Sequence, residues 1–527
     1  MHTNASISIF LFSITAIALC TAEKVSAEVV ETVDQPVVVD SKSSVEIDLE
    51  TAVAYSLNQN PNVKISSSNV ALRSGLLQSV SGEFDWTPFA AVDFDRVESP
   101  VLTLISPSDT LINETIEYSI GMRKKFRNGI EVTPSVSAEI ETNYLGISET
   151  SSAASLWNLE VLIPLLKGGG RTSANARERA FDYDLQAARS AYLQVLSDQA
   201  LLMINAYWRY AASSARVDIL AGIEQRAQNL IDTTRSMVDA KILSPSVLPQ
   251  AKANLNDQSA LYLAAKTDQA QDRYNFGLAL GLEPEEFVHI PVPVMKGSSG
   301  EARPVIDYSE LIRLTFNRRS DIRSIRQSLQ GRSVQLDGAK HDLLPRLDLI
   351  LSTGYTGGNS KNEPLAVLGD NLRGTNWGVE VVMDFPFGNN FRRGNVSQYE
   401  AEVYRTEQQL IRLKQRVSAS AMEALDVMNF SFERLRIAQD TEQLYKEAVA
   451  ITAKRLAAGE ASVFEVIDME GRYARSSMDS ISAQRDYYIS VGRLRFETGT
   501  LFEELTAQGS FVLSKLDDPS IPVTPDL

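Results

Sequence analysis

IPLLKGGGR, residues 163–171, ends an apolar run at a proline and opens a long proline-free stretch, and FPFGNNFRR, residues 385–393, repeats this arrangement. Strand-like alternation precedes each proline, and helix-favouring residues follow it. A glycine-rich loop before a helix can bind phosphate. A P-loop, however, needs its lysine after the glycines, whereas Lys167 precedes them. Both stretches therefore predict a sharp hinge between strand and helix, with glycines permitting the bend. The residues assigned to such hinges are Pro88, Pro164, Gly168, Pro345, Pro386 and Gly388.

Two long helices are predicted from the placement of proline. None of the 19 prolines lies in residues 165–244 or 387–518. Within these windows, residues 171–240 and 395–458 are rich in Ala, Leu, Gln, Glu, Arg and Ser, which suits helices. The second helix carries one apolar stripe with heptad-like spacing. The first carries two neighbouring stripes, which predict either contacts with helices on both sides or one broad core-facing surface.

Strand-like alternation marks the segments between the helices. An additional pair of alternating runs, in residues 118–141, surrounds Asn128-Gly129, a dipeptide typical of tight hairpin turns. The first half of the chain is therefore expected to carry an extra hairpin. The other strand-like segments are 82–96, 155–164, 342–355 and 376–386.

The motifs occur twice in the same order, which predicts a mixed, mostly α fold built from two internal repeats. AVAYSLNQNPNVKI (52–65) parallels LIRLTFNRRSDIRS (311–324), and MVDAKILSPSVLPQA (237–251) parallels LAAGEASVFEVIDME (456–470). The predicted divisions are a signal peptide at 1–27, a periplasmic linker at 28–47, a first repeat at 48–282, a connector at 283–307, a second repeat at 308–503 and a tail at 504–527. The first repeat is expected to contain strands in about 88–164, a long helix at 171–240 and a helix at 246–281. The second is expected to contain strands in about 345–386, a long helix at 395–458 and a helix at 461–500.

The N-terminus predicts export. An apolar core from Ile7 to Cys20 is followed by small residues that a signal peptidase accepts, so we expect cleavage after Ala27. Lipidation of Cys20 stays open as an alternative, although Leu19 stands where a small residue is wanted. No later apolar run approaches the roughly 20 residues of a membrane-spanning helix. The net charge of −16 argues against nucleic acid as the main partner.

The chain resembles the TolC-type outer membrane efflux proteins. The resemblance lies in the junctions LLPRLDLILSTG (343–354), IPLLKGGGR and FPFGNNFRR, and in the helix-turn-helix RLAAGEASVFEVIDME (455–470). It implies a homotrimer in which each protomer gives four strands to one outer-membrane β-barrel and its helices to a periplasmic α-helical barrel. It also implies a channel that receives substrates from a periplasmic adaptor and an inner-membrane pump, in efflux or in type I secretion. The extra hairpin departs from the four-strand pattern, and it could either widen the barrel or project from it.

An acidic helix start is the main candidate site. If a helix restarts near Ser462, then Glu465 and Asp468 lie three residues apart and share a face. The resemblance places them at the periplasmic entrance constriction, where a trimer would make a cation-selecting ring of them. The alternative is a solvated helix face. Relatives often have an Arg where this chain has Ala461, so an ionic latch through that position is doubtful. The helix-turn-helix residues expected to contact the adaptor are Lys241, Ser244, Gly459, Glu460 and Ala461.

The sequence predicts no metal site, cofactor or catalytic centre. The three histidines, His2, His289 and His341, are scattered, and no nucleophile signature is present. We therefore expect a channel in the outer membrane rather than an enzyme. The alternatives are a non-conducting periplasmic coiled-coil scaffold, which has no use for strands bounded by prolines, and a periplasmic enzyme without a recognisable site. The exported substrate and the type of pump are not encoded in these motifs.

Overall fold

The structure is a computed structural model of the chain. The chain divides into two units, Met1–Ser44 and Val45–Leu527, and every described residue belongs to the second. The described residues are 47–100, 110–145, 148–293, 295, 306–359, 372–505 and 511–516. The signal peptide, its cleavage after Ala27, Cys20 and residues 28–46 of the linker lie outside them, as do parts of the connector and of the tail.

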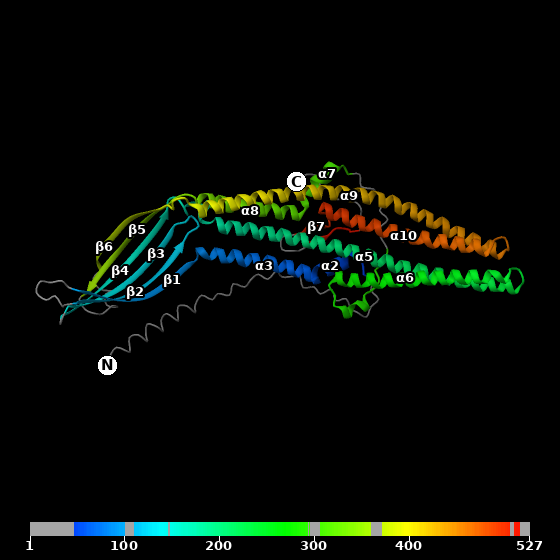
Figure 1. The fold of residues 1–527 in the computed structure, drawn as a ribbon, viewed down its shortest axis with the longest axis horizontal. Coiled ribbons are helices and arrows are strands. Elements are labelled where there is room, and N and C mark those ends of the chain that lie inside the picture. The colour runs from blue at the N-terminus through cyan, green and yellow to red at the C-terminus, as the bar shows by residue number, and fades with distance from the viewer. Residues whose placement is uncertain are drawn as a thin grey trace, which may run out of the picture. The chain divides into compact units, whose positions relative to one another are not determined.

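Helices dominate the described chain, as the predicted mostly α fold class requires (Figure 1). The two longest, α5 and α9, contain 64 and 68 residues and occupy most of the two proline-free windows. A short break at Asn175 separates α4 from α5. The helices are α2 (Leu49–Gln59), α3 (Pro61–Ser81), α4 (Gly170–Ala174), α5 (Ala176–Asp239), α6 (Leu248–Leu280), α7 (Tyr308–Arg318), α8 (Ser320–His341), α9 (Asn390–Ala457) and α10 (Val463–Thr498).

Within the described residues, six antiparallel strands form one sheet in sequential order. The strands around Asn128-Gly129 pair with each other and lie in the middle of this sheet, between β1 and β4. A separate two-stranded sheet is formed by β7 (Phe502–Leu505) and β8 (Phe511–Leu513). The strands of the large sheet are β1 (Trp86–Pro100), β2 (Thr110–Lys125), β3 (Glu131–Leu145), β4 (Ser148–Pro164), β5 (Arg346–Asn359) and β6 (Leu372–Asp384).

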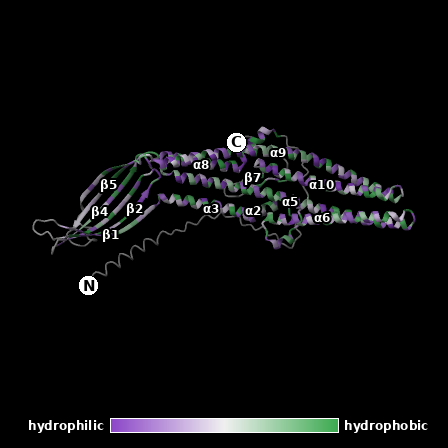
Figure 2. Cartoon of the chain, in the orientation of Figure 1, coloured by the Kyte–Doolittle hydropathy of each residue, from purple (hydrophilic) through white to green (hydrophobic). Residues whose placement is uncertain are grey.

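The two faces of the large sheet differ in polarity. Residues paired across neighbouring strands share a face, and the face alternates along each strand. The pairing puts apolar residues of all six strands on one face. The hydropathy of each residue is coloured in Figure 2. We call this the apolar face; it includes Val92, Phe94, Ile116, Ile120, Val136, Ile140, Trp157, Leu159, Leu351, Val379 and Val381. The opposite, polar face includes Asp93, Glu117, Glu139, Asn158, Ser352 and Glu380.

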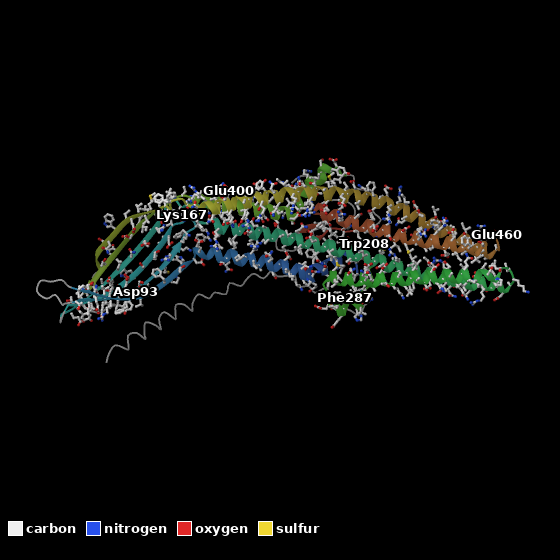
Figure 3. The ribbon with its side chains drawn as sticks, in the orientation of Figure 1. Asp93, Lys167, Trp208, Phe287, Glu400 and Glu460 are labelled. Atoms are coloured by element: carbon white, nitrogen blue, oxygen red, sulfur yellow. The ribbon has the colours of Figure 1, made fainter. Side chains whose placement is uncertain are left out.

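The helices pack in a row of four. Next to the sheet the neighbours run in the order α3, α5, α8, α9, and further from it in the order α6, α5, α10, α9. Helix α5 therefore has helices on both sides, which is the first of the two interpretations of its double stripe. The predicted stripe of α9 is buried at Leu413, Val417 and Met428. The largest cluster of buried side chains is centred on Trp208 (labelled in Figure 3), Phe276 and Tyr488.

Two equivalent helix ends support the predicted duplication. Helix α6 ends at Gly281 and helix α10 ends at Gly499, both in the left-handed conformation that favours glycine. A Cβ on Gly281 would lie 2.9 Å from the Cα of Asn60, and one on Gly499 would lie 3.3 Å from the backbone nitrogen of Arg319. Asn60 and Arg319 are matched positions of the two predicted repeats, each between two helices. The duplication itself stays a prediction.

Candidate functional site

Two helix turns lie together at the end of the helices away from the sheet (Figure 3, near Glu460). Lys241, with a φ of 61°, ends the α5 side of one turn, and Gly459, with a φ of 77°, ends the α9 side of the other. A small apolar cluster joins the two turns, and Ala461 contributes to it. The other residues predicted for adaptor contact, Lys241, Ser244, Gly459 and Glu460, are exposed. Their role stays a prediction.

Glu465 begins α10 as part of a capping box. The hydroxyl of its N-cap residue, Ser462, accepts a hydrogen bond from the Glu465 backbone at 3.2 Å, and the Ser462 backbone donates to the Glu465 carboxylate at 3.4 Å. The second carboxylate oxygen lies 3.8 Å from a guanidinium nitrogen of Arg455, from the end of α9. The same guanidinium donates to the carbonyl of Glu460 at 3.1 Å. Glu465 thus combines a structural role with an ion pair across the turn.

Asp468 lies one turn further along α10 and has a different arginine. The Nε of Arg472 donates to its carboxylate at 3.0 Å. Hydrogen bonds to Tyr445 and then to Asp468 raise the pKa of Arg472, which keeps that guanidinium charged. Each predicted acidic residue therefore has a cationic partner within the same chain. Neither arginine was assigned from the sequence. Arg472 is four residues from Asp468 on the same helix, whereas Arg455 meets Glu465 only once the helix turn is closed.

A groove of about 980 Å³ runs between α9 and α10 near these residues. Asp468 and Arg472 are in its lining, whereas Glu465 is not. The lining combines apolar side chains such as Phe430 and Ile437 with further arginines, Arg434 and Arg475, and one residue of α6, Asn254. The two predicted acidic residues therefore face different surroundings within one chain.

The glycine-rich hinge at 163–171 packs against the turn of the β2–β3 hairpin. Gly168 has a φ of 81°, and Gly129 in the hairpin turn has a φ of 92°. A Cβ on Gly129 would lie 2.2 Å from the carbonyl oxygen of Gly168, and one on Gly169 would lie 2.4 Å from that of Pro164. These glycines therefore permit a close approach of two backbones as well as a bend.

Four backbone N–H groups of this hinge, those of Leu165, Lys167, Gly169 and Gly170, donate to protein carbonyls. Gly170 donates to Asn128 at 3.0 Å, Lys167 donates to Pro345 at 3.2 Å, and Leu165 donates to Leu347 at 2.8 Å. A phosphate loop needs such groups free to face the anion. The hinge interpretation therefore has a structural basis that the phosphate interpretation lacks.

The second hinge has a left-handed pair in place of the glycine run. Pro386 and Gly388 follow β6, Gly388 has a φ of 83°, and the next residue, Asn389, has a φ of 46°. The Asn389 amide donates to the carbonyl of Leu343 at 3.3 Å, which fixes the hinge next to Pro345. One predicted hinge residue is displaced: the helix-to-strand change occurs at Gly82–Asp85, so Pro88 lies inside β1.

A salt bridge fixes the hairpin turn to the start of α5. Two guanidinium nitrogens of Arg127 donate to the Glu178 carboxylate at 2.7 and 2.6 Å. The Ser81 hydroxyl donates to the same carboxylate at 3.0 Å, which adds the end of α3 to the contact. Arg127 also lies over the ring of Phe84, 5.0 Å from its centroid. The turn, α3 and α5 are therefore held together at one point.

Replacement of Gly129 by alanine is expected to destabilise the hinge. The added Cβ combines an unfavourable positive φ with a clash against Gly168, and we expect a loss of about 1–3 kcal/mol. The measurement is the thermal midpoint of the purified protein in mild detergent. Gly75→Ala is the matched control, because its Cβ would meet no atom within 4 Å. That helical substitution should raise stability by roughly 0.5–1 kcal/mol. Equal midpoints for the two variants would contradict the packing argument.

The Arg127–Glu178 contact is expected to weaken in acid. The hydrogen bonds from Arg127 lower the pKa of Glu178. The contact therefore stabilises the folded protein fully at pH values above the ordinary glutamate pKa of about 4.3. This stabilisation disappears as the pH falls through the lower pKa that Glu178 has in the folded protein. Because Arg127 is half exposed, Glu178→Gln should cost only about 0.5–1 kcal/mol at pH 7. The difference in melting between the variant and the parent should shrink as the pH is lowered below about 4.3. Glu400→Gln, which removes the exposed pair with Lys340, is the control.

None of the helices in the described segments is long and apolar enough to cross a membrane. Among the same residues, no three His, Cys, Asp or Glu side chains are grouped so that they could hold a metal ion.

Residues 311–500 match the sequence model of a family described as "Outer membrane efflux protein". The outer-membrane channel OprN has a similar structure, with a TM-score of 0.64 and 16% identity over 87% of this chain and 90% of that one. The Campylobacter jejuni outer membrane channel CmeC gives a TM-score of 0.60 and 13% identity over 86% and 85%. The Vibrio cholerae outer membrane protein VceC gives 0.60 and 13% over 86% and 96%. No curated protein matches the chain by sequence.

At these identities the structural matches show the fold, whereas the family model matches residues 311–500 only. The sequence resemblance is confirmed by both findings. The localisation predicted with it, in the outer membrane with an extension into the periplasm, is confirmed as well. Residues 311–500 are thus similar in sequence to the outer membrane efflux protein family, and the chain shares its fold with solved outer-membrane channels.

Proposed function

We propose that three copies of this chain form a channel that passively conducts substrates from a periplasmic adaptor and an inner-membrane pump to the cell exterior. The efflux protein family and the channel fold support the conducting role. The trimer, its partners and the choice between a tripartite efflux pump and type I secretion are the proposed part. The mechanism needs no catalytic residue, because the pump supplies the energy.

The observation that carries this proposal is a sheet with an apolar and a polar face, continued by a row of helices. Six strands are too few to enclose a pore, because barrels of about eight strands are already filled by side chains. In lipid an open sheet edge leaves backbone groups without partners. Copies that join edge to edge remove both difficulties, with apolar faces toward lipid and polar faces toward water.

The adaptor is proposed to dock at the two helix turns. Lys241, Ser244, Gly459, Glu460 and Ala461 lie there, at the end furthest along the helices from the sheet (Figure 1). Two apolar residues beside them, Ile242 and Phe464, are more than 60% exposed. Exposed apolar groups flanked by charged turns are suited to a protein partner.

Glu465 and Asp468 are proposed to form the acidic ring at the entrance. The ion pair of Arg455 with Glu465 joins the end of α9 to the start of α10 and takes the place of the latch that Ala461 cannot provide. In a closed entrance this pair holds the turn together, and both arginines reduce the negative field. Opening the turn would separate Arg455 from Glu465 and expose that carboxylate to cations, whereas Asp468 keeps Arg472 on the same helix.

Recording from the purified protein in planar lipid bilayers tests the channel. Discrete conductance steps that favour cations, from a trimer in mild detergent, are the expected result. A monomeric mass without any conductance would favour the non-conducting scaffold instead.

Neutralising the acidic ring is expected to weaken cation preference. Glu465→Gln with Asp468→Asn removes two negative charges from each copy and should reduce the cation-to-anion permeability ratio by roughly twofold or more. Arg472→Gln should shift the ratio in the opposite direction, because it leaves Asp468 without its partner. Reversal potentials in a salt gradient measure both. Glu285→Gln with Glu503→Gln removes two exposed charges elsewhere and should leave the ratio unchanged.

A further inference from the structure

The β2–β3 hairpin belongs to the wall of the sheet by its position and its length. The order of strands places it between β1 and β4, with hydrogen-bonded neighbours on both sides. Its two strands have 16 and 15 residues, and the other four have 13 to 17. About 9–11 tilted residues cross the hydrocarbon layer, so each of the six strands is long enough.

The hairpin is also apolar on the same side as its neighbours. Ile116 and Ile120 of β2 and Val136 and Ile140 of β3 continue the apolar face without interruption from Val92 to Trp157. A hairpin that projected into water would leave this whole face exposed. Its continuity therefore indicates that lipid covers β2 and β3 as it covers the other strands.

The base of the hairpin is fixed to the helices. The Asn128 carbonyl accepts from Gly170, Arg127 forms the salt bridge with Glu178, and the ammonium of Lys125 pairs with Glu83 at 2.5 Å. These contacts tie its turn to the strand–helix junctions on both sides. The hairpin is therefore held in line with the remaining strands at the helix end.

The open flanks of the sheet and of the helix row are on the same elements. Within the described segments, β1 and β6 each have a strand neighbour on one side only. Helix α3 leads into β1, and β6 leads into α9, so the edge strands continue as edge helices (Figure 1). Both edge helices expose apolar side chains: Ile65 and Leu72 of α3, and Phe391, Tyr404 and Ile411 of α9.

These two flanks also have the right directions to join. β1 runs away from the helices and β6 runs back toward them, so β6 of one copy and β1 of the next would pair in the antiparallel manner of the rest of the sheet. Their apolar faces would be continuous, with Val92 and Phe94 beside Val379 and Val381. A second copy of this chain would therefore pair with the backbone groups of the edge strand, continue the apolar face and run in the antiparallel direction.

We propose that copies join through a seam formed by β1 and α3 of one copy and β6 and α9 of the next, with β2 and β3 as full members of the wall. Given the trimer of the proposed function, on which this inference rests, the barrel has 18 strands, three copies of six. The resemblance alone implied four strands from each copy.

An 18-stranded barrel encloses a wide, water-filled lumen, because barrels of 16–18 strands leave an aqueous channel. The polar face has a feature that needs such water. Asp93, Glu117 and Glu139 lie directly opposite one another on three neighbouring strands, and like charges in that position repel. Figure 3 labels Asp93 on the sheet. Water in the lumen screens this row, so the barrel is an open vestibule and the narrow point lies at the helix turns.

Cysteine pairs test the seam directly. In a Cys20→Ser background, Val92→Cys on β1 is combined with single cysteines at alternate apolar-face positions of β6, namely Trp377, Val379, Val381 and Met383. After oxidation at least one pair should give covalent dimers and trimers on a denaturing gel. Ile120→Cys on β2 is the matched control: it shares the apolar face but should link to no β6 cysteine. Cross-links from Ile120 rather than Val92 would overturn the seam.

Labelling tests whether the hairpin is in the wall. In liposomes a water-soluble maleimide should label Ser119→Cys and Ser137→Cys on the polar face, and should leave Ile120→Cys and Val136→Cys on the apolar face unlabelled. Equal labelling of both faces in a conducting trimer would show that the hairpin projects, and would overturn this inference while the channel stands. Failure of the channel itself would appear separately, as absence of conductance and of the trimer.

Removing the hairpin tests the size of the barrel. Replacement of residues 101–148 by an Asn-Gly turn keeps the alternation of strand directions and brings β1 beside β4, with Val92 opposite Trp157 and the apolar faces still matched. The diameter should fall to about two-thirds, because it grows nearly in proportion to strand number. The radius of the largest polyethylene glycol that enters from the strand side should fall in the same proportion. An unchanged polymer cut-off in conducting channels would contradict the 18-stranded wall.

Discussion

Trp208→Ala is expected to lower the free energy of unfolding by about 3–5 kcal/mol, among the largest effects of any single substitution in the helices. Trp208 is only 2% exposed and lies on α5, where its ring stacks on Tyr488 of α10 with centroids 4.3 Å apart and planes 13° apart. Tyr207 meets it edge-on at 5.2 Å. Truncation removes both ring contacts and leaves a cavity where α5 and α10 cross.

The measurement is the rate of thermal unfolding in mild detergent, followed by circular dichroism, because large membrane proteins often unfold irreversibly. Trp208→Phe retains part of the ring contact and should lie between parent and alanine variant. Val288→Ala, at an exposed position, should change stability by less than about 0.5 kcal/mol. If Trp208→Ala unfolds at the parental rate, the contact between α5 and α10 does not hold the bundle together.

Arg319→Met is the second substitution with a large expected cost, about 3–5 kcal/mol. Arg319 is 7% exposed, at the joint between α7 and α8. Its guanidinium donates to Glu497 at 2.7 Å and binds Asp321 through two nitrogens at 2.8 and 3.1 Å. Burial raises the pKa of Glu497, and the charge of Arg319 opposes this rise first, followed by that of Arg493. Without Arg319, a buried carboxylate is left without its counter-ion.

A double substitution separates the pair from the packing. Arg319→Met with Glu497→Leu removes both charges, and it should be less destabilising than Arg319→Met alone, because no unpaired buried carboxylate remains. Asp321 is still held by the backbone of Ile322 at 2.8 Å in either variant. Unfolding in guanidinium chloride at pH 7 compares them. A double variant that is as unstable as the sum of its parts would show that Glu497 does not depend on Arg319.

Local signals in the sequence identified most elements of the fold. The absence of proline predicted α5 and α9, because a helix interior excludes it. A helix start near Ser462 was expected, and the structure shows that Ser462 and Glu465 form a capping box there. Asn128-Gly129 marked the turn between β2 and β3, because a left-handed residue is needed there. Each of these signals acts within about four residues.

Local sequence signals predicted only part of the candidate site. Glu465 and Asp468 could be selected by their spacing on one helix, but their partners come from different places. Arg472 is four residues from Asp468, at a spacing that a helix makes adjacent. Arg455 lies on the previous helix and meets Glu465 only because the turn at Gly459 folds back. The close approach of Gly129 to Gly168 joins two turns far apart in sequence, and no periodicity records it.

The sequence by itself determined the helices, the hinges and the alternating strands, because backbone conformation, capping and polarity are set by neighbouring residues. Only the tertiary structure decided that β2 and β3 lie inside the sheet and that β1 and β6 are its edges. The physical reason is that strand pairing is a choice among long-range partners whose hydrogen bonds are chemically alike. The observed pairing is favoured by the apolar face that all six strands share and by the ion pair that holds the hairpin turn against α5.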